Sequence, residues 1–204
     1  MREVKDLLLA TMNRDKVTEI AGLVKDLGIN VLDLTAYPEF PEVEEGGESL
    51  EENSLLKARE SFKYTGLTAM ADDTGLFVDA LDGEPGVFSS RFAGENASYD
   101  DNCRLLLEKM HGVPDPERSA RFTCVVALVF PWGDEKLFKG EVEGIILGES
   151  RGQKGFGYDP VFYHQPSGKT FAEMDLEEKN ALSHRAIAVR KAVLYLTEVV
   201  NRKS

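Results

Sequence analysis

The sequence predicts an α/β fold in which helices flank a central mixed sheet, and three features of the pattern support this class. Residues 6–34 pass from a short apolar run through a helical pattern to a second apolar run, an order that predicts a strand, a helix and a parallel strand. Residues 121–147 hold two long apolar runs around a tight turn, which predicts an antiparallel hairpin. An amphipathic pattern from about Ser183 onward predicts a long closing helix.

The N-terminal segment predicts an edge of the sheet where a ligand could bind. Residues 6–10 (DLLLA) form a buried strand, and residues 30–34 (NVLDL) form the strand beside it. The helix between them has apolar side chains on one face from Val17 to Leu27 and stops at Gly28. Open α/β sheets bind ligands at the carboxyl ends of their strands, so the turn after the first strand is a candidate site.

The next helix and strand lead to an acidic pair. Ser49 and Glu52 have the S-x-x-E spacing of a capping box, which predicts that a helix begins there. Residues 67–71 (LTAMA) form a third strand, with Asp72 and Asp73 at its carboxyl end. Adjacent carboxylates that emerge from a buried strand need a positive partner, such as a helix N-terminus, a basic side chain or a metal ion.

The rest of the chain continues the mixed pattern without a visible break. Ser98 and Asp101 predict the N-terminus of another helix, and a glycine-spaced loop at 148–160 leads into a short strand at 161–164. There is no internal repeat, low-complexity segment or obvious linker. We therefore expect residues 1–204 to form a single two-lobed domain.

Composition bounds the class of protein. The 204 residues include 24 lysines and arginines against 36 acids, a net charge of −12 that argues against binding a nucleic acid polymer. Cys103 and Cys124 form no C-x-x-C motif, which disfavours a zinc site or a disulfide framework. The apolar runs are too short to cross a membrane, and no signal peptide pattern is present, so we expect a cytoplasmic protein with no membrane partner.

Asn13 and Lys16 occupy the turn between the first strand and the first helix. Backbone N–H groups and the helix dipole favour an anion at such a position, and Lys16 adds a full charge. The alternative is a capping turn with a solvated lysine. A P-loop is excluded, because the turn has no glycine, and the tripeptide at 168–170 (GKT) has Tyr163 where the motif requires glycine.

Carboxylates and a lysine from separate segments suggest a site for a metal and a phosphate chain. Glu44 and Glu45 precede two glycines in a loop, and Lys57 lies in the helix that follows. Mg²⁺ commonly takes one or two carboxylates together with substrate phosphates, so these glutamates and Asp73 could meet around the ion. An acidic loop exposed to solvent is the alternative interpretation.

Two further motifs suggest a site for a planar base. Phe156 stands between two glycines in the loop at 148–160, where its ring could stack on a base or turn back into the core. His184 and Arg185 begin the closing helix, where the helix dipole disfavours cations. This mismatch favours a role in ligand binding, with a solvated pair as the alternative.

Together these motifs resemble the inosine triphosphate pyrophosphatase family, enzymes that hydrolyse noncanonical purine nucleoside triphosphates to a monophosphate and pyrophosphate. The resemblance implies the family's fold, a central mixed sheet with two lobes and an active-site cleft between them, and a homodimer. Five motifs occur in the family's order and spacing, nearly from end to end of the chain. They are ATMNRDKVTEI, EEGGESLEENSLLKA, ADDTGLFVDALDGEPGVFSSRFAG, GFGYDPVFY and KNALSHRA.

The resemblance also implies a role for each matching residue. Glu44, Glu45 and Asp73 would hold Mg²⁺, with Asp73 also acting as general base or orienting the attacking water. Thr74 replaces the serine of many relatives, and Met12 stands where glycine is frequent. The predicted substrate-binding residues are Thr11, Met12, Asn13, Arg14, Asp15 and Lys16 around the triphosphate, Lys57 and Thr74 at the phosphates, Phe156 stacked on the purine with Gly157 and Tyr158 beside it, and Asp159, Lys179, His184 and Arg185 at the edge of the base.

The expected substrates are small molecules, ITP, dITP and XTP, whose 6-oxo group accepts hydrogen bonds from donors such as Arg185 and His184. Adenine has a 6-amino donor there, which would leave those donors unpaired at a cost of ~1–3 kcal/mol each. Two alternatives stand beside this prediction. One is a pyrophosphatase of the Maf type, which acts on pyrimidine nucleotides, and the other is a nucleotide-sensing protein without turnover.

Overall fold

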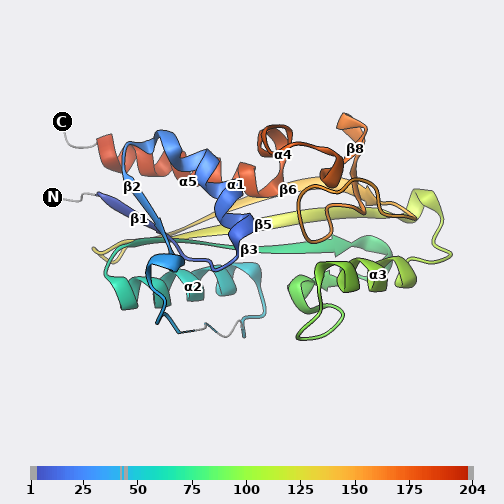
Figure 1. Ribbon diagram of the computed structural model, residues 1–204, viewed down its shortest axis with the longest axis horizontal. Helices are drawn as coiled ribbons and strands as arrows, with labels where there is room; N and C mark the ends of the chain where they lie inside the picture. The colour runs from blue at the N-terminus through green and yellow to red at the C-terminus, as the bar shows by residue number, and fades with distance from the viewer. Residues whose placement is uncertain (1–3, 42, 44–45, 202–204) are drawn as a thin grey trace. The chain divides into compact units, whose positions relative to one another are not determined.

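A computed structural model describes residues 4–41, 43 and 46–201 of the chain and confirms the mixed α/β class. One sheet has the strand order β2-β1-β3-β5-β6-β7-β8, and β4 pairs with β3 (Figure 1). The strands are β1 (Asp6–Leu9), β2 (Asn30–Asp33), β3 (Thr68–Val78), β4 (Pro85–Gly86), β5 (Ser119–Val129), β6 (Glu135–Ile146), β7 (Phe162–His164) and β8 (Lys169–Thr170). The α-helices are α1 (Arg14–Val24), α2 (Leu50–Thr65), α3 (Tyr99–Lys109), α4 (Leu176–Leu182) and α5 (His184–Asn201).

The chain divides into two compact units. Within the described residues, the first unit takes in the chain up to Asp73, the segment Cys124–Gly140 and the chain from Arg185 onward. The second unit takes in Thr74–Thr123 and Glu141–His184. Strands β3, β5 and β6 therefore each contribute residues to both units.

The N-terminal strands form as the pattern predicts. β1 pairs with β2 and with β3, in both cases in parallel. Asn13 is the N-cap of α1, and its side chain accepts hydrogen bonds from the backbone N–H groups of Asp15 and Lys16. This cap satisfies donors that the first helical turn would otherwise leave unpaired. The α-helix ends at Val24, and a 3₁₀ turn carries the chain on to the expected stop at Gly28.

Helix α2 begins and ends at the expected residues, with a different arrangement at its cap. The Ser49 side chain accepts a hydrogen bond from the Glu52 backbone N–H, as a capping box requires. The Glu52 carboxylate, however, accepts from the backbone N–H of Glu48 at 2.8 Å. Gly66 follows the last turn and donates its N–H to the Phe62 carbonyl.

The prediction that Asp72 and Asp73 end a strand is wrong, because β3 continues through both residues to Val78. The last residue of β1, Leu9, lies opposite Met70, so the acidic pair comes just after the paired segment. Both aspartates are buried inside a strand, and such carboxylates persist only where cations face them. The cations that face them are described below.

Helices cover both faces of the sheet in the first unit. Helices α1 and α5 lie on one face and α2 lies on the other (Figure 1). The core under α1 and α5 is built from Leu7, Leu9, Ile20, Val24, Met70, Cys124, Val126, Leu128, Phe130, Ala188, Val189, Ala192 and Leu196, among others. The core under α2 consists largely of alanines, Ala10, Ala58, Ala69, Ala71 and Ala127, with Val129. These small side chains let α2 approach the strands closely.

In the second unit, Arg118 joins α3 to the hairpin of β5 and β6. Its guanidinium donates to the backbone carbonyls of Ile146 and Leu147 in one direction and of Met110 and Val113 in the other. Adjacent strands joined by so short a connection run antiparallel, as predicted for this hairpin. Helix α3 starts with the expected capping box, formed by Ser98 and Asp101.

Candidate active site

The turn after β1 places Lys16 beside Asp72. Lys16 Nζ lies 3.0 Å from Asp72 Oδ2, and the lysine side chain keeps 16% of its surface exposed while the carboxylate has none exposed. The Asn13 cap fixes the first turn of α1, from which Lys16 extends. The structure therefore brings the predicted anion-binding lysine to the predicted acidic pair.

Asp72 is held by a second cation, Arg185, from the start of α5. Arg185 Nε donates to Asp72 Oδ2 at 3.2 Å, and Nη1 pairs with Glu19 of α1. Burial alone would raise the pKa of Asp72, yet the charges of Lys16, Arg185 and Lys57 outweigh it and hold this pKa well below its usual range. Burial alone would lower the pKa of Arg185, and Asp72 and Glu19 instead raise it, so the guanidinium stays charged.

Asp73 faces a separate set of partners on α2. Its Oδ1 lies 2.8 Å from Lys57 Nζ, and its Oδ2 accepts from Asn53 Nδ2 at 3.3 Å. The other predicted metal ligands, Glu44 and Glu45, lie outside the described residues. Among the residues that are described, no group of three acidic, histidine or cysteine side chains could hold a metal ion. Asp73 is thus the one predicted metal ligand whose surroundings are defined.

The loop that carries Phe156 is organised by Asp159. Asp159 Oδ2 accepts the Phe156 backbone N–H at 2.8 Å and pairs with Lys179 of α4. Gly155 has a φ of +69°, and a Cβ at this residue would overlap the Asp159 carboxylate, so both conformation and space require glycine. Lys179 Nζ lies 4.8 Å from the centre of the Phe156 ring, within the range of a cation–π contact.

Tyr158 and His184 of the predicted set are buried within the second unit. The Tyr158 hydroxyl donates to the Ser89 carbonyl at 2.9 Å, and burial raises the pKa of this hydroxyl well above its usual value. The His184 ring stacks on Phe122 with a centroid distance of 4.5 Å. Both rings therefore have partners within the protein, and their predicted contacts with a base stay predictions.

The remaining predicted residues lie in the turn before α1, in its first turn, in β3 and in the Phe156 loop. The Thr11 hydroxyl accepts the Asn13 N–H at 3.1 Å, which shapes the turn. Met12 is 63% exposed, and Arg14 and Asp15 are also exposed on the first turn of α1. Thr74 follows Asp73 in β3 and is half-buried, and the Gly157 carbonyl accepts from Cys103 Sγ at 3.2 Å.

Two residues that bind members of the predicted set, Glu19 and Asn53, are themselves absent from it. Glu19 pairs with Arg185, and Asn53 donates to Asp73. Glu19 lies one turn after Lys16 on α1, and Asn53 lies one turn before Lys57 on α2. Residues three or four positions apart share a face of a helix, so each could have been found by reading one turn along from a predicted lysine. The first helical turn of α5 gave no indication that Arg185 would pair with Glu19.

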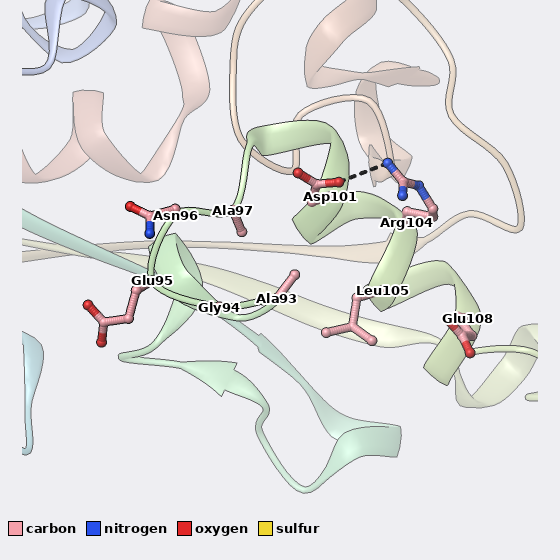
Figure 2. A pocket seen from close by; sticks show the side chains of 9 residues that line it. All are labelled: Ala93, Gly94, Glu95, Asn96, Ala97, Asp101, Arg104, Leu105 and Glu108. Carbon is pink, nitrogen blue, oxygen red and sulfur yellow. Dashed lines mark hydrogen bonds and ion pairs between the residues drawn. The ribbon is translucent and has the colours of Figure 1, made fainter.

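The second unit also carries an open hollow of about 510 Å³ on α3 and the loop before it. Figure 2 shows that its lining includes a charged pair, Asp101 and Arg104, on the helix. The lining residues are Ala93, Gly94, Glu95, Asn96, Ala97, Asp101, Arg104, Leu105 and Glu108. None of them belongs to the predicted site, so the hollow adds no residue to it.

The predicted residues of the first unit and those of the second unit differ in chemistry. In the first unit, Lys16 and Lys57 pair with two buried carboxylates, a set suited to phosphate groups and a divalent cation. In the second unit, Phe156 and Lys179 offer a ring face and a cation, a set suited to a planar base. No helix in the described part of the chain has the length and apolar character needed to cross a membrane.

Comparison with known proteins agrees with this chemistry. The model of the Ham1 family matches residues 7–195. A dITP/XTP pyrophosphatase from Geobacter sulfurreducens is 50% identical over 183 residues, which cover 90% of this chain and 92% of that protein. A dITP/XTP pyrophosphatase from Bacillus cereus is 45% identical over 193 residues, 94% of each chain.

Solved structures of related proteins have the same fold. A HAM1 protein from Coxiella burnetii superposes with a TM-score of 0.86 at 42% identity, covering 95% of this chain and 98% of that one. The Ham1 protein of Staphylococcus aureus gives 0.85 at 37% identity, covering 95% and 99%. The resemblance found in the motifs is thereby confirmed over nearly the whole chain. The chain belongs to the Ham1 family.

Proposed function

We propose that this chain hydrolyses noncanonical purine nucleoside triphosphates, ITP, dITP and XTP, to the monophosphate and pyrophosphate. The observation that carries the proposal is the pair of buried aspartates, each matched to its own lysine: Asp72 with Lys16 and Asp73 with Lys57. The names of the dITP/XTP pyrophosphatases from Geobacter and Bacillus support the same activity. The enzyme would remove abnormal purine nucleotides from the nucleotide pool.

The first unit would bind the triphosphate. The turn from Thr11 to Lys16 presents backbone N–H groups and a lysine, and Lys57 adds a second positive charge beside Asp73. These cations would neutralise charge that develops on the departing pyrophosphate. Asp73, the carboxylate held by Lys57 and Asn53, would orient the attacking water or accept its proton.

Asp73, the proposed ligand that the structure describes, is an oxygen donor of the kind that Mg²⁺ prefers. Asp73 supplies one carboxylate, and Mg²⁺ is commonly bound by one or two carboxylates together with substrate phosphates. Glu44 and Glu45 are the proposed second source of oxygen ligands. When bound, Mg²⁺ would polarise the phosphoryl oxygens and lower the pKa of water. A zinc site is disfavoured, because Cys124 is the one cysteine seen near Asp72 in the described part of the chain, with Sγ 4.0 Å from Asp72 Oδ2, and no group of three possible zinc ligands occurs among the described residues.

The second unit would bind the base. Phe156 would stack on the purine, and Lys179, fixed by Asp159, would meet its edge together with His184. An edge-reading role for Arg185 stays part of the proposal. Its pairing with Asp72 and Glu19 adds a second role, holding Asp72 in place between α1 and α5.

Product analysis tests the proposed function. Purified protein is incubated with Mg²⁺ and, separately, with ITP, XTP, dITP, GTP, ATP and dTTP, and pyrophosphate is measured apart from orthophosphate. We expect pyrophosphate from the 6-oxo purines ITP, XTP and dITP, and no turnover after chelation until Mg²⁺ is restored. Orthophosphate as the product would contradict the proposed bond, and turnover confined to dTTP would favour the Maf-type alternative. Binding without turnover would favour a nucleotide sensor.

We further propose that the enzyme is a homodimer, as its family resemblance implies, and that it is located in the cytoplasm, as expected from the sequence. Light scattering after size-exclusion chromatography would measure the mass, with twice the monomer mass expected. Fractionation of cells that express the chain at its natural level would test the location. A monomer at enzyme concentrations that support full activity would contradict the proposed dimer.

A further inference from the structure

The ring of Phe156 depends on other segments for its orientation. Gly155 and Gly157 flank it with φ values of +69° and +61°, and neither has a side chain that could pack on the ring. The Phe156 backbone N–H is held by Asp159 at 2.8 Å. That bond fixes the backbone of the loop and leaves rotation about the side-chain bonds of Phe156 to be set by packing.

Tyr99 of α3 packs against this ring. The two ring centroids are 5.7 Å apart and the planes are inclined by 43°, which lies within the range of favourable aromatic pairs. Lys179, whose Nζ lies 4.8 Å from the Phe156 centroid, is already engaged by Asp159. Tyr99 is thus a contact of this ring that the proposed base-binding set does not include.

A second contact joins helix α3 to the loop that carries Phe156. Cys103, four residues after Tyr99, donates its thiol to the Gly157 carbonyl at 3.2 Å. Residues four apart lie on the same face of a helix, so Tyr99 and Cys103 present one face of α3 to the Phe156 loop. The capping box of Ser98 and Asp101 fixes the turn from which Tyr99 extends. The backbone from which the Tyr99 ring extends is therefore fixed, and contact with Phe156 orients the ring.

Helix stability does not account for a tyrosine at this residue. Tyr99 is the first residue of α3 and is 42% exposed. Acidic residues and proline suit such a position better than an aromatic residue, which loses side-chain freedom in a helix. Contact with Phe156 gives this ring a packing partner.

We propose that Tyr99 is a positioning residue of the base-binding region, which holds the Phe156 ring in the orientation that stacks on the purine. The inference rests on the proposed function, and it names a residue of α3 that neither the motifs nor the charge pattern indicated. Because an aromatic pair is worth a modest free energy, its loss corresponds to a change in affinity of about three- to tenfold.

Equilibrium binding separates this role from a general structural role. ITP binding is measured in the presence of a chelator, so that no turnover occurs, and tripolyphosphate serves as a ligand without a base. In Tyr99→Ala we expect ITP binding to weaken by about three- to tenfold while tripolyphosphate binding is unchanged. Tyr99→Phe, which keeps the ring, restores ITP binding. In turnover assays with Mg²⁺, the KM for ITP rises and kcat changes little.

Two variants serve as controls. Tyr64→Ala removes a tyrosine of similar exposure, 47%, that packs on Tyr37 and Phe40 in the first unit. Glu108→Ala alters the exposed face of α3 that lines the hollow. Both should bind ITP as the wild type does.

The inference is overturned if Tyr99→Ala binds ITP as tightly as the wild type. It is also overturned if ITP and tripolyphosphate lose affinity to the same extent, since that pattern indicates a disturbed fold. Failure of the proposed function looks different: the wild-type protein binds ITP but releases no pyrophosphate with Mg²⁺. In that case the loss of ITP binding in Tyr99→Ala still supports the inference about Tyr99.

Discussion

Arg185 and Asp72, which are 113 positions apart in the sequence, form a buried ion pair in which the guanidinium Nε donates to the carboxylate at 3.2 Å. Arg185 also pairs with Glu19, and the side chains of all three residues are at most 5% exposed. One guanidinium thereby joins α1, β3 and α5 inside the first unit. Each of these three buried charges is therefore stabilised by an opposite charge within the same group.

Arg185→Ala should destabilise the protein as well as alter base selection. The substitution leaves Glu19 and Asp72 buried without this cation, and breaking a buried pair typically costs roughly 3–5 kcal/mol in the free energy of unfolding. Urea unfolding measures the loss, and the ratio of kcat/KM for ITP and ATP measures selection. Arg190→Ala, on the exposed face of the same helix, serves as the control. Adding Glu19→Gln to Arg185→Ala should recover part of the lost free energy of unfolding, because it removes one of the buried negative charges. If the losses from the two substitutions add instead, Glu19, Asp72 and Arg185 do not stabilise one another.

Asp73→Asn should abolish turnover and leave the fold intact. An amide cannot accept a proton from water, and general base catalysis is worth about 10²–10⁴ in rate, so kcat should fall by at least about a hundredfold. Kinetics with ITP and a thermal unfolding curve of the same preparation measure the two effects. Asp79→Asn, at an exposed carboxylate paired with Arg121, is the matched control. Near-normal activity in Asp73→Asn would remove Asp73 from the mechanism.

Gly155→Ala should weaken base binding. A Cβ at this residue meets the Asp159 carboxylate, which accepts the Phe156 N–H and pairs with Lys179. The clash displaces the loop that carries the proposed stacking ring, so we expect a higher KM for ITP with tripolyphosphate binding unchanged. At Gly148, by contrast, a Cβ meets nothing within 4 Å, and Gly148→Ala is the control. Equal KM values in the two variants would show that the tight turn has no role in binding.

The ion pair between Arg59 and Glu135 should make a small contribution to stability that depends on pH. Two hydrogen bonds, of 2.7 and 2.6 Å, join α2 to β6, and the hydrogen bond with Arg59 lowers the pKa of Glu135 from its ordinary value. Both side chains are partly exposed, which limits the expected contribution to about 1 kcal/mol or less.

The direction of this pH dependence follows from the lowered pKa. The contribution is fully present above the unfolded-state pKa of about 4.3 and is lost as the pH falls through the lower, folded-state pKa. Urea unfolding of wild type and Glu135→Gln should therefore differ at pH 7 and converge below about pH 4. A difference that grows as the pH falls would contradict this assignment.

Both thiols should be unreactive in the native protein. Burial, with smaller effects from Asp100 and Asp159, raises the pKa of Cys103 to about 12, and Cys124 is fully buried. Since the thiolate is the reactive form, an aromatic disulfide reagent at pH 8 should modify neither cysteine until the protein is unfolded. Rapid modification of one thiol in the folded protein would show that its segment opens readily.

Local sequence patterns predicted the parts of the fold that short-range forces decide. Asn13, Ser49 and Ser98 each cap the helix that follows, because a side-chain acceptor beside a free backbone N–H acts within one turn. The hairpin of β5 and β6 and the pairing of β1 with β2 follow from apolar periodicity and connection length. The motifs likewise pointed to the family, and through it to Lys16, Lys57, Asp73 and Phe156.

The tertiary structure decided which charges meet. The sequence placed two adjacent aspartates together, yet β3 runs through them, and their opposite partners, Lys16 and Arg185 for one and Lys57 for the other, come from three different helices. The tertiary structure also brought Tyr99 to Phe156, a contact that no local pattern predicts. The physical reason is range: capping and periodicity act over a few residues, whereas the partner of a buried charge depends on which segments pack together.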